Sequence, residues 1–431
     1  MFNNRLRWFI LGWLFIITLV SYMDRVNLSV AVPLIMKEFH LNASQIGVVI
    51  SGLTIGYTIM NFPGGFLADR FSPKWILVIA LILWSLLTIA TGLAWSFASL
   101  FIIRILFGAS EGPLGPCNTK IVSQWMLPRE RGTASGLWLS AMTLGMVVGA
   151  PLSAYIIHSY GWRSVFYIFG VGGIGLALLT TYLLQSKPEE HPWIDKHELA
   201  VIREHNYPEK MSVQKESSGK LLLAVFSSPL AWLLALTYFG LTALYWANVG
   251  WLPTYFVKAR GSNILSSGLY SALPYFSASL GPVIIGALSD RLFKGWRSPL
   301  LITVSIITVP FVFIAVNAAQ LETSLIAFCL AAFFDFAGIG LMWALSLELF
   351  PKERVAAASG FMLMWGSAAG ILSPIITGVI LQNTGSFNHA YYAFAIAALF
   401  SAILAVGLLL REKELRNLKG LTGAQAGVSG S

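Results

Sequence analysis

The sequence predicts an all-α membrane protein with 12 transmembrane helices in two pseudo-symmetric six-helix bundles. Its composition, its succession of apolar runs and an internal repeat lead to this prediction. Of the 431 residues, 56% are hydrophobic and 11% are charged, whereas soluble domains carry roughly 25% charged residues. The mean hydropathy is +0.73. This composition excludes a single soluble core and indicates that the chain lies in lipid.

Twelve apolar runs follow one another along the chain, separated by short polar turns. A helix needs about 20 apolar residues to cross ~30 Å of hydrocarbon, and the runs have about this length. They cover residues 8–36, 45–68, 75–94, 98–118, 132–157, 163–185, 222–256, 265–289, 299–317, 323–349, 356–381 and 390–410. No small-residue cleavage site follows the first run, so we expect a retained span and not a removed signal peptide.

The second half of the chain repeats the first. The matching pairs are GGFLADRFSPK at 64–74 with IGALSDRLFKG at 285–295, LPRERGTASG at 127–136 with FPKERVAAASG at 350–360, and Gly145/Gly149 with Gly366/Gly370. Their nearly constant spacing predicts two parallel bundles related by an axis along the membrane normal, with a central site between them. We expect an N-terminal bundle at 1–185, a cytoplasmic linker at 186–220, a C-terminal bundle at 221–412 and a cytoplasmic tail at 413–431. Within the linker, Trp193–His205 has the apolar spacing of a surface helix.

The positive charges follow the expected topology. The formal net charge is +9, but most of the 28 Lys and Arg residues fall in segments that alternating spans place on one side. The other side has Lys37, Arg163, Lys258 and Arg260. Because Lys and Arg concentrate on the cytoplasmic side, we expect a multi-pass protein of the cell inner membrane with both termini in the cytoplasm. The basic excess gives no reason to expect a nucleic-acid partner.

The sequence offers little for cofactor or metal chemistry. Cys117 and Cys329 lie within apolar runs, so neither a disulfide framework nor a metal-ligand cluster is expected. No G-x4-G-K-[ST] phosphate loop occurs in the chain. We therefore expect no cofactor and no metal, and a secondary transporter that works as a monomer in the bilayer.

Several motifs resemble those of one transporter superfamily. The G-x-L-A-D-R element ending at Arg70, its copy ending at Arg291 and the charged central loop resemble the major facilitator superfamily over the whole chain. Further motifs resemble its anion:cation symporter family of sugar-acid permeases, aromatic-acid permeases and sialin-type carriers: Tyr22–Asn27, Phe62–Gly65, Gly108–Pro113 and Gly161–Arg163. The resemblance implies the major facilitator fold and proton-coupled uptake of an organic anion by alternating access.

Five ionisable residues lie inside the predicted spans: Asp24, Arg25, Arg104, Glu111 and Asp335. A charge at membrane depth costs at least a few kcal/mol, so each needs a partner, a polar cavity or a function. Arg25 is the first candidate for the substrate carboxylate, because a guanidinium holds a carboxylate bidentately and stays charged. Arg104 and Glu111 share a helix face about 10 Å apart along the axis, and an anion would fit between them. The alternative is that both arginines only neutralise the carboxylates.

Proton coupling would fall to carboxylates, because the six histidines lie in loops or at span ends. A carboxylate that loses its arginine partner to an arriving anion gains affinity for a proton. The family resemblance implies this role for Asp24 and Glu111, the alternative being permanent ion pairs. Asp335 lies one place from the equivalent of Glu111 in the second half, and is either a second proton site or a polar core contact.

Aromatic residues and two departures from the family bear on the substrate. By resemblance, Tyr57, Trp246 and Trp343 align with cavity-facing positions and are expected to pack against substrate, although most such residues are packing or interfacial anchors. Sugar-acid permeases tend to carry amides near the positions of Met142 and Leu363. Apolar walls would leave substrate hydroxyls unpaired at about 1–3 kcal/mol each, which favours an aromatic or short aliphatic carboxylate over a sugar acid.

The repeated charge motifs lie at the cytoplasmic ends of spans. Asp69, Arg70, Asp290 and Arg291 are expected to latch the outward-facing state, or only to set topology. Two other function classes remain as alternatives: a proton-coupled exporter of the same fold, and an integral-membrane enzyme. An exporter of cationic drugs would need an acidic cavity without arginines, and a membrane enzyme would need a metal or nucleophile cluster at membrane depth.

Overall fold

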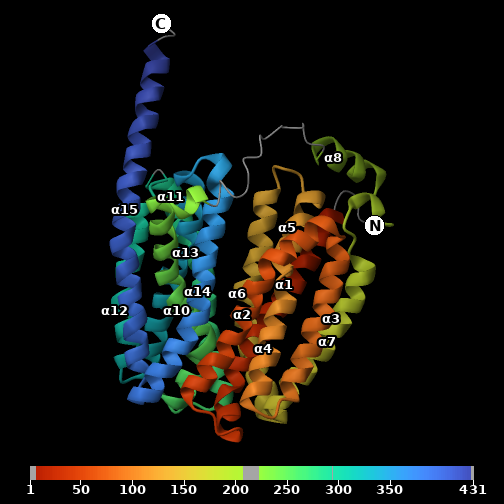
Figure 1. Ribbon diagram of the computed structural model, residues 1–431, viewed down its shortest axis with the longest axis vertical. Helices are drawn as coiled ribbons and strands as arrows, with labels where there is room; N and C mark the ends of the chain where they lie inside the picture. Colours follow the sequence, from red (N-terminus) through yellow and green to blue (C-terminus); the bar gives the residue numbers. More distant parts are fainter. Residues whose placement is uncertain (1–5, 207–222, 294, 429–431) are drawn as a thin grey trace. The chain divides into compact units, whose positions relative to one another are not determined.

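The computed structural model describes residues 6–206, 223–293 and 295–428. Within these ranges the chain is almost entirely helical, and 12 helical segments are long and apolar enough to cross a membrane, which confirms the predicted fold class. The helices are α1 (Leu6–Glu38), α2 (Ala43–Arg70), α3 (Pro73–Gly92), α4 (Phe97–Glu111), α5 (Leu114–Trp125), α6 (Arg131–Tyr160), α7 (Trp162–Leu183), α8 (Lys196–Asn206), α10 (Pro229–Lys258), α11 (Ile264–Arg291), α12 (Ser298–Asn317), α13 (Leu321–Leu349), α14 (Lys352–Thr384) and α15 (Phe387–Val428), as labelled in Figure 1.

Two spans differ from the apolar runs. The fourth continues to Trp125, and a turn at Gly112-Pro113 divides it into α4 and α5, because proline has no amide hydrogen to continue the helical ladder. The seventh span, α10, begins at Pro229. The predicted start at residue 222 lies outside the described residues, and a turn at 227–228 separates the helical residues 223–226 from α10. Ser228 precedes it and accepts a hydrogen bond from the amide of Ala231 at 3.4 Å, which is N-cap chemistry that hydropathy does not reveal.

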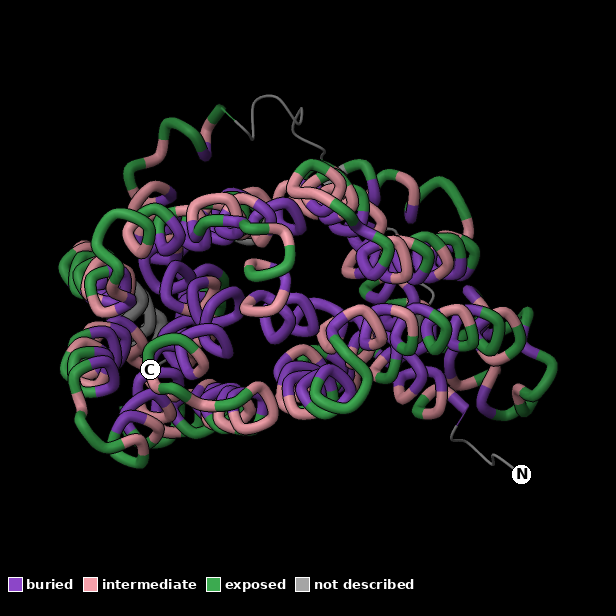
Figure 2. Tube along the Cα trace, turned by 90° about the horizontal axis from the view of Figure 1, so that it is seen from below, coloured by how far each residue is buried: buried purple, intermediate pink, exposed green. Residues whose placement is uncertain are grey.

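The helices form two compact units. The first comprises the described residues within Met1–Val213, Val249–Tyr275 and Pro374–Asn383, and the second the remainder. Within each unit, buried residues face the inside of the bundle and exposed ones face outward (Figure 2). The exposed residues include many large apolar side chains, as expected for surfaces that contact lipid.

Close backbone contacts bring α2 and α4 together in the first unit. A Cβ atom on Gly56 would lie 1.8 Å from the carbonyl oxygen of Ile105, and one on Gly108 would lie 1.8 Å from that of Leu53. Side chains larger than hydrogen are therefore excluded at both positions, as at other tight helix interfaces in membranes. This seam places Tyr57, the neighbour of Gly56, next to the helix that carries Arg104 and Glu111.

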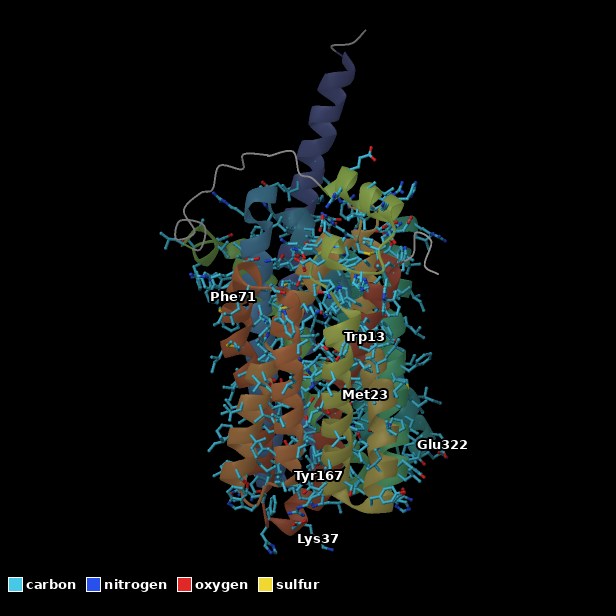
Figure 3. All side chains as sticks on the ribbon, turned by 90° about the vertical axis from the view of Figure 1, so that its right-hand side faces the viewer. Trp13, Met23, Lys37, Phe71, Tyr167 and Glu322 are labelled. Carbon is cyan, nitrogen blue, oxygen red and sulfur yellow. The ribbon has the colours of Figure 1, made fainter. Side chains whose placement is uncertain are left out.

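Helix α6 packs equally tightly along α1. A Cβ atom on Gly145 would lie 2.5 Å from the carbonyl oxygen of Leu19, and one on Gly149 would lie 2.8 Å from the Cα of Met23. The Gly145-x3-Gly149 pattern thus serves close helix packing, as its spacing predicts. Figure 3 shows Met23 midway along α1, between Trp13 and Lys37.

The linker docks on the first unit through buried polar groups. Glu198 of α8 is fully buried and accepts hydrogen bonds from the amides of Leu6 and Arg7 at 3.1 and 3.2 Å, so it satisfies amides that the first turn of α1 leaves without partners. Nδ1 of His191 accepts from the amide of Trp193 at 3.2 Å. Burial lowers the pKa of His191 below its ordinary value of 6.5, although a hydrogen bond to the Leu183 carbonyl opposes the shift.

Candidate functional site

The centre of the candidate site is an ion pair between α1 and the end of α4. Arg25 Nε donates to Glu111 Oε2 at 3.0 Å, and Ser21 Oγ donates to Glu111 Oε1. The side chains of Arg25 and Glu111 are 5% and 0% exposed. Ser21 and Arg25 lie four residues apart and therefore on one face of α1, so a single helix binds both oxygens of the carboxylate.

Two tyrosine rings enclose the guanidinium of Arg25. Its Cζ lies 4.3 Å from the ring centroid of Tyr22 and 4.9 Å from that of Tyr57. Such cation–π contacts contribute about 0.5–2 kcal/mol each, and two of them hold the guanidinium plane in a defined orientation. Tyr57 therefore lies beside Arg25, and its contact with substrate stays a prediction.

A second pair of charges lies close to the first. Asp24 is 1% exposed, and its Oδ1 accepts from Asn27 Nδ2 at 3.2 Å. Arg104 is 2% exposed, lies over the ring of Phe107 at 4.6 Å and is within electrostatic range of Asp24, Arg25 and Glu111. Buried Asp24 Oδ2 and Arg104 Nε have no hydrogen-bond partner within the described residues.

Four ionisable side chains lie together in the first unit's core. With both carboxylates ionised, Asp24 and Glu111 supply two negative charges and Arg25 and Arg104 two positive ones. A buried charge is tolerated only with compensation, and here each sign compensates the other. An added anion would break this balance unless a positive charge, such as a proton, arrived with it.

The remaining candidate residues belong to the second unit. Asp335 on α13 is 3% exposed, and its Oδ1 has no hydrogen-bond partner in the described part of the chain. Trp343 is 39% exposed and packs edge-on against Tyr238 at 6.4 Å. Trp246 packs edge-on against Tyr245 at 5.3 Å.

The repeated charge motifs make short contacts within their own units. Asp69 lies 3.7 Å from Lys120, and Asp290 lies 3.3 Å from Arg297, which also bonds Glu348 at 2.7 Å. Arg70 and Arg291, which follow the two aspartates, are exposed. Phe71, next to Arg70, lies toward the same end of the bundle as Trp13 and opposite Lys37 (Figure 3).

Sequence reasoning missed Ser21, which contacts Glu111 directly. An uncharged serine within an apolar run has no distinctive signal by itself. Its position four residues before Arg25, on the face that also carries Thr18, is the signal that would have pointed to it. Thr18 accepts a hydrogen bond from Asn118 at 3.1 Å, so polar contacts continue along α1 toward its N-terminal end.

Twelve helices able to span a membrane, with two acidic and two basic side chains buried in the first unit, are the features of a multi-pass membrane transporter. The profile of the Major Facilitator Superfamily matches residues 14–349, and the chain belongs to this superfamily. This result confirms the resemblance seen in the motifs and supports a transporter and not an enzyme.

Relatives and solved structures agree with this assignment. The chain is 33% identical to a probable galactarate/D-glucarate transporter of Bacillus subtilis, covering 95% of this chain and 94% of that one. It is 30% identical to a probable sulfoacetate transporter of Cupriavidus necator, covering 94% and 92%. A bacterial homologue of the human lysosomal transporter Spinster superposes with a TM-score of 0.76 at 19% identity, covering 95% and 98%, which supports the fold alone.

Proposed function

We propose that the protein takes up a small organic anion together with protons by alternating access. The observation that carries the proposal is the buried Arg25–Glu111 pair. In it the guanidinium of Arg25, which can bind an anion, is bonded to the carboxylate of Glu111, which can bind a proton. Transport of organic acids by relatives that match over nearly their whole length supports the anion part of the proposal.

The coupling follows from competition for Arg25. An incoming carboxylate binds the guanidinium and displaces Glu111, which then lacks its cationic partner and accepts a proton. Asp24, near Arg104, is the second coupling carboxylate, and Arg104 is a further substrate contact. Because the four charges sum to zero, a monoanion with one proton, or a dianion with two, leaves the loaded site neutral for transit across the membrane.

The substrate is expected to be less hydroxylated than a sugar acid. Met142 packs against the apolar core of the first unit, and Leu363 is 43% exposed on the second. Neither side chain can pair with a hydroxyl, and each unpaired hydroxyl would cost about 1–3 kcal/mol. Trp246 and Trp343 provide apolar surface for the substrate, and Asp335 adds a proton site in the second unit. Sulfoacetate and aromatic carboxylates therefore rank above galactarate as ligands.

The proposed orientation follows the positive-inside rule. Lys and Arg at the loop ends favour a cytoplasmic location for both termini in the cell inner membrane. The Asp69-Arg70 and Asp290-Arg291 motifs then lie at the cytoplasmic ends of α2 and α11 and would stabilise the outward-facing state. Their pairing with Lys120 and Arg297 supports a role in holding these helix ends.

Uptake into proteoliposomes tests the proposal. Labelled sulfoacetate, galactarate and benzoate are offered at equal concentrations, with and without an inward proton gradient. Uptake by protein-free liposomes, into which neutral benzoic acid diffuses, is subtracted. We expect accumulation of at least one anion above equilibrium, and collapse of the accumulated anion when a protonophore is added. Uptake at the same full rate with and without the proton gradient would refute symport. Accumulation driven by an outward proton gradient would instead establish an antiporter or exporter.

A further inference from the structure

We infer that Ser21 is a positioning residue that sets the proton affinity of Glu111 and thereby the pH range of coupling. The inference rests on the proposed function, in which Glu111 is a proton carrier. It starts from one hydrogen bond, in which the hydroxyl of Ser21 donates to Glu111 Oε1 while Arg25 donates to Oε2. Ser21 and Glu111 are both fully buried, so this bond forms in a low-dielectric environment where it is strong.

The hydrogen bond of Ser21 differs from those of its neighbours. Thr18 donates to the carbonyl of Leu14 at 2.9 Å, and Ser29 donates to that of Val26 at 2.8 Å. Such bonds within the helix are the usual choice for a buried serine or threonine. Ser21 instead donates across to the carboxylate that ends α4, which indicates that the side chain serves Glu111 and not its own helix.

A hydroxyl can follow Glu111 through both protonation states. When Glu111 is ionised, Ser21 Oγ–H donates to the carboxylate and stabilises the charged form. When a proton binds Oε1, the new O–H donates to Ser21 Oγ, and the serine proton turns toward its own helix, as in Thr18. Arg25 has donors only and cannot accept from a protonated carboxyl. Ser21 therefore keeps the buried carboxyl paired after Arg25 moves to the substrate.

The size of the effect follows from the strength of the bond. A hydrogen bond to a charged group contributes about 1.5–3 kcal/mol, and 1.36 kcal/mol corresponds to one pH unit. Without the Ser21 hydroxyl the carboxylate loses this stabilisation. The protonated carboxyl also loses its bond to Ser21, worth about 0.5–1.5 kcal/mol, so only the difference of about 1–1.5 kcal/mol shifts the equilibrium. Protonation of Glu111 in Ser21→Ala should then occur at a pH about one unit higher than in the wild type.

Infrared titration of the purified protein in lipid, with sulfoacetate present at saturating concentration to occupy Arg25, tests the inference without measuring transport. The protonated-carboxyl band of Glu111 is assigned by its loss in Glu111→Gln and followed against pH. We expect the midpoint to rise in the order wild type, Ser21→Cys, Ser21→Ala, because a thiol is a weaker donor of similar size. Ser29→Ala, a buried serine of the same helix, should keep the wild-type midpoint.

The outcomes separate the inference from the proposed function. An unchanged Glu111 midpoint in both Ser21 variants would overturn the role of Ser21 and leave Glu111 as the proton carrier. A shift of equal size in Ser29→Ala would assign the effect to general loosening of α1 and would also overturn it. A wild-type protein whose Glu111 band does not appear on acidification even with sulfoacetate bound would overturn the coupling role itself.

Discussion

Replacing Arg25 with lysine removes the planar guanidinium but keeps the positive charge. In the structure the guanidinium donates through Nε to Glu111 at 3.0 Å and stacks on Tyr22 and Tyr57 at 4.3 and 4.9 Å. A lysine ammonium is a compact point charge without a planar fork. It would still attract a carboxylate, but it would lose the bidentate grip and the orientation imposed by the two rings.

The expected loss can be worked from these contacts. One charge-assisted hydrogen bond contributes about 1.5–3 kcal/mol, and weaker stacking removes about 0.5–1 kcal/mol more. The ammonium of lysine keeps the positive charge and so regains part of the lost binding energy. We expect a net loss of about 2–3 kcal/mol in the free energy of anion binding. Since 1.4 kcal/mol is tenfold in affinity, this corresponds to a roughly 30- to 150-fold rise in Kd.

Binding of sulfoacetate and benzoate to purified protein, followed by thermal shift and calorimetry, measures this change. Arg163→Lys is the matched control, because Arg163 also bonds a carboxylate, Glu38, at 2.7 Å and stacks on Trp162 at 4.3 Å, but lies at the start of α7. We expect nearly wild-type affinity in the control. Wild-type affinity in Arg25→Lys would remove Arg25 from the binding site and refute the reasoning.

Three further predictions concern the fold and the linker. Glu198→Gln should lower the free energy of unfolding by about 1.5–3 kcal/mol, because α1 loses a charged partner for its first amides, whereas exposed Glu204→Gln should not; thermal unfolding in detergent measures both. The lowered pKa of His191 means that the folded state binds fewer protons than the unfolded state below pH 6.5. Stability should therefore be fully present above pH 6.5 and fall as the pH drops from 6.5 through the lower pKa of His191 in the folded state, less so in His191→Gln. Gly56→Ala should destabilise the protein by about 1–3 kcal/mol through overpacking against α4, and Gly132→Ala, which has open space around it, should not.

Specific results would contradict each of these predictions. Equal melting temperatures for Glu198→Gln and Glu204→Gln would show that the buried carboxylate does not secure α1. A wild-type melting temperature that rises on acidification between pH 7 and 5.5, relative to His191→Gln, would show that protonation of His191 stabilises the folded state, opposite to the prediction. A stable Gly56→Ala protein would mean that α2 and α4 can separate without cost.

Much of the fold and the centre of the site could be predicted from the sequence because lipid restricts what a chain can do. Apolar runs must become helices, and Asp24, Arg25 and Glu111 stand out because charges are costly there. Ser21 could not be predicted, since an uncharged hydroxyl is common in apolar helices and only its partner across the helix interface reveals its use. The burial of Glu198 could not be predicted either, because the sequence of a charged linker helix is typical of a solvent-exposed one.

The local boundaries were missed for a different reason. Hydropathy averages over a window, whereas a proline or a capping serine acts at one residue. The break at Gly112-Pro113 and the start of α10 at Pro229 therefore depend on backbone chemistry that the averages hide. The break also ends α4 at Glu111, so a boundary that hydropathy overlooks is the one that places the central carboxylate.

Simultaneous measurement of anion and proton entry tests the central claim most directly. Proteoliposomes containing a pH-sensitive dye receive an inward gradient of sulfoacetate with no initial pH difference, with protein-free liposomes as the control for passive leakage. We predict that wild-type protein acidifies the lumen as the anion enters, and that Glu111→Gln exchanges anion across the membrane without moving protons. Anion entry by wild-type protein with no luminal acidification would contradict the account.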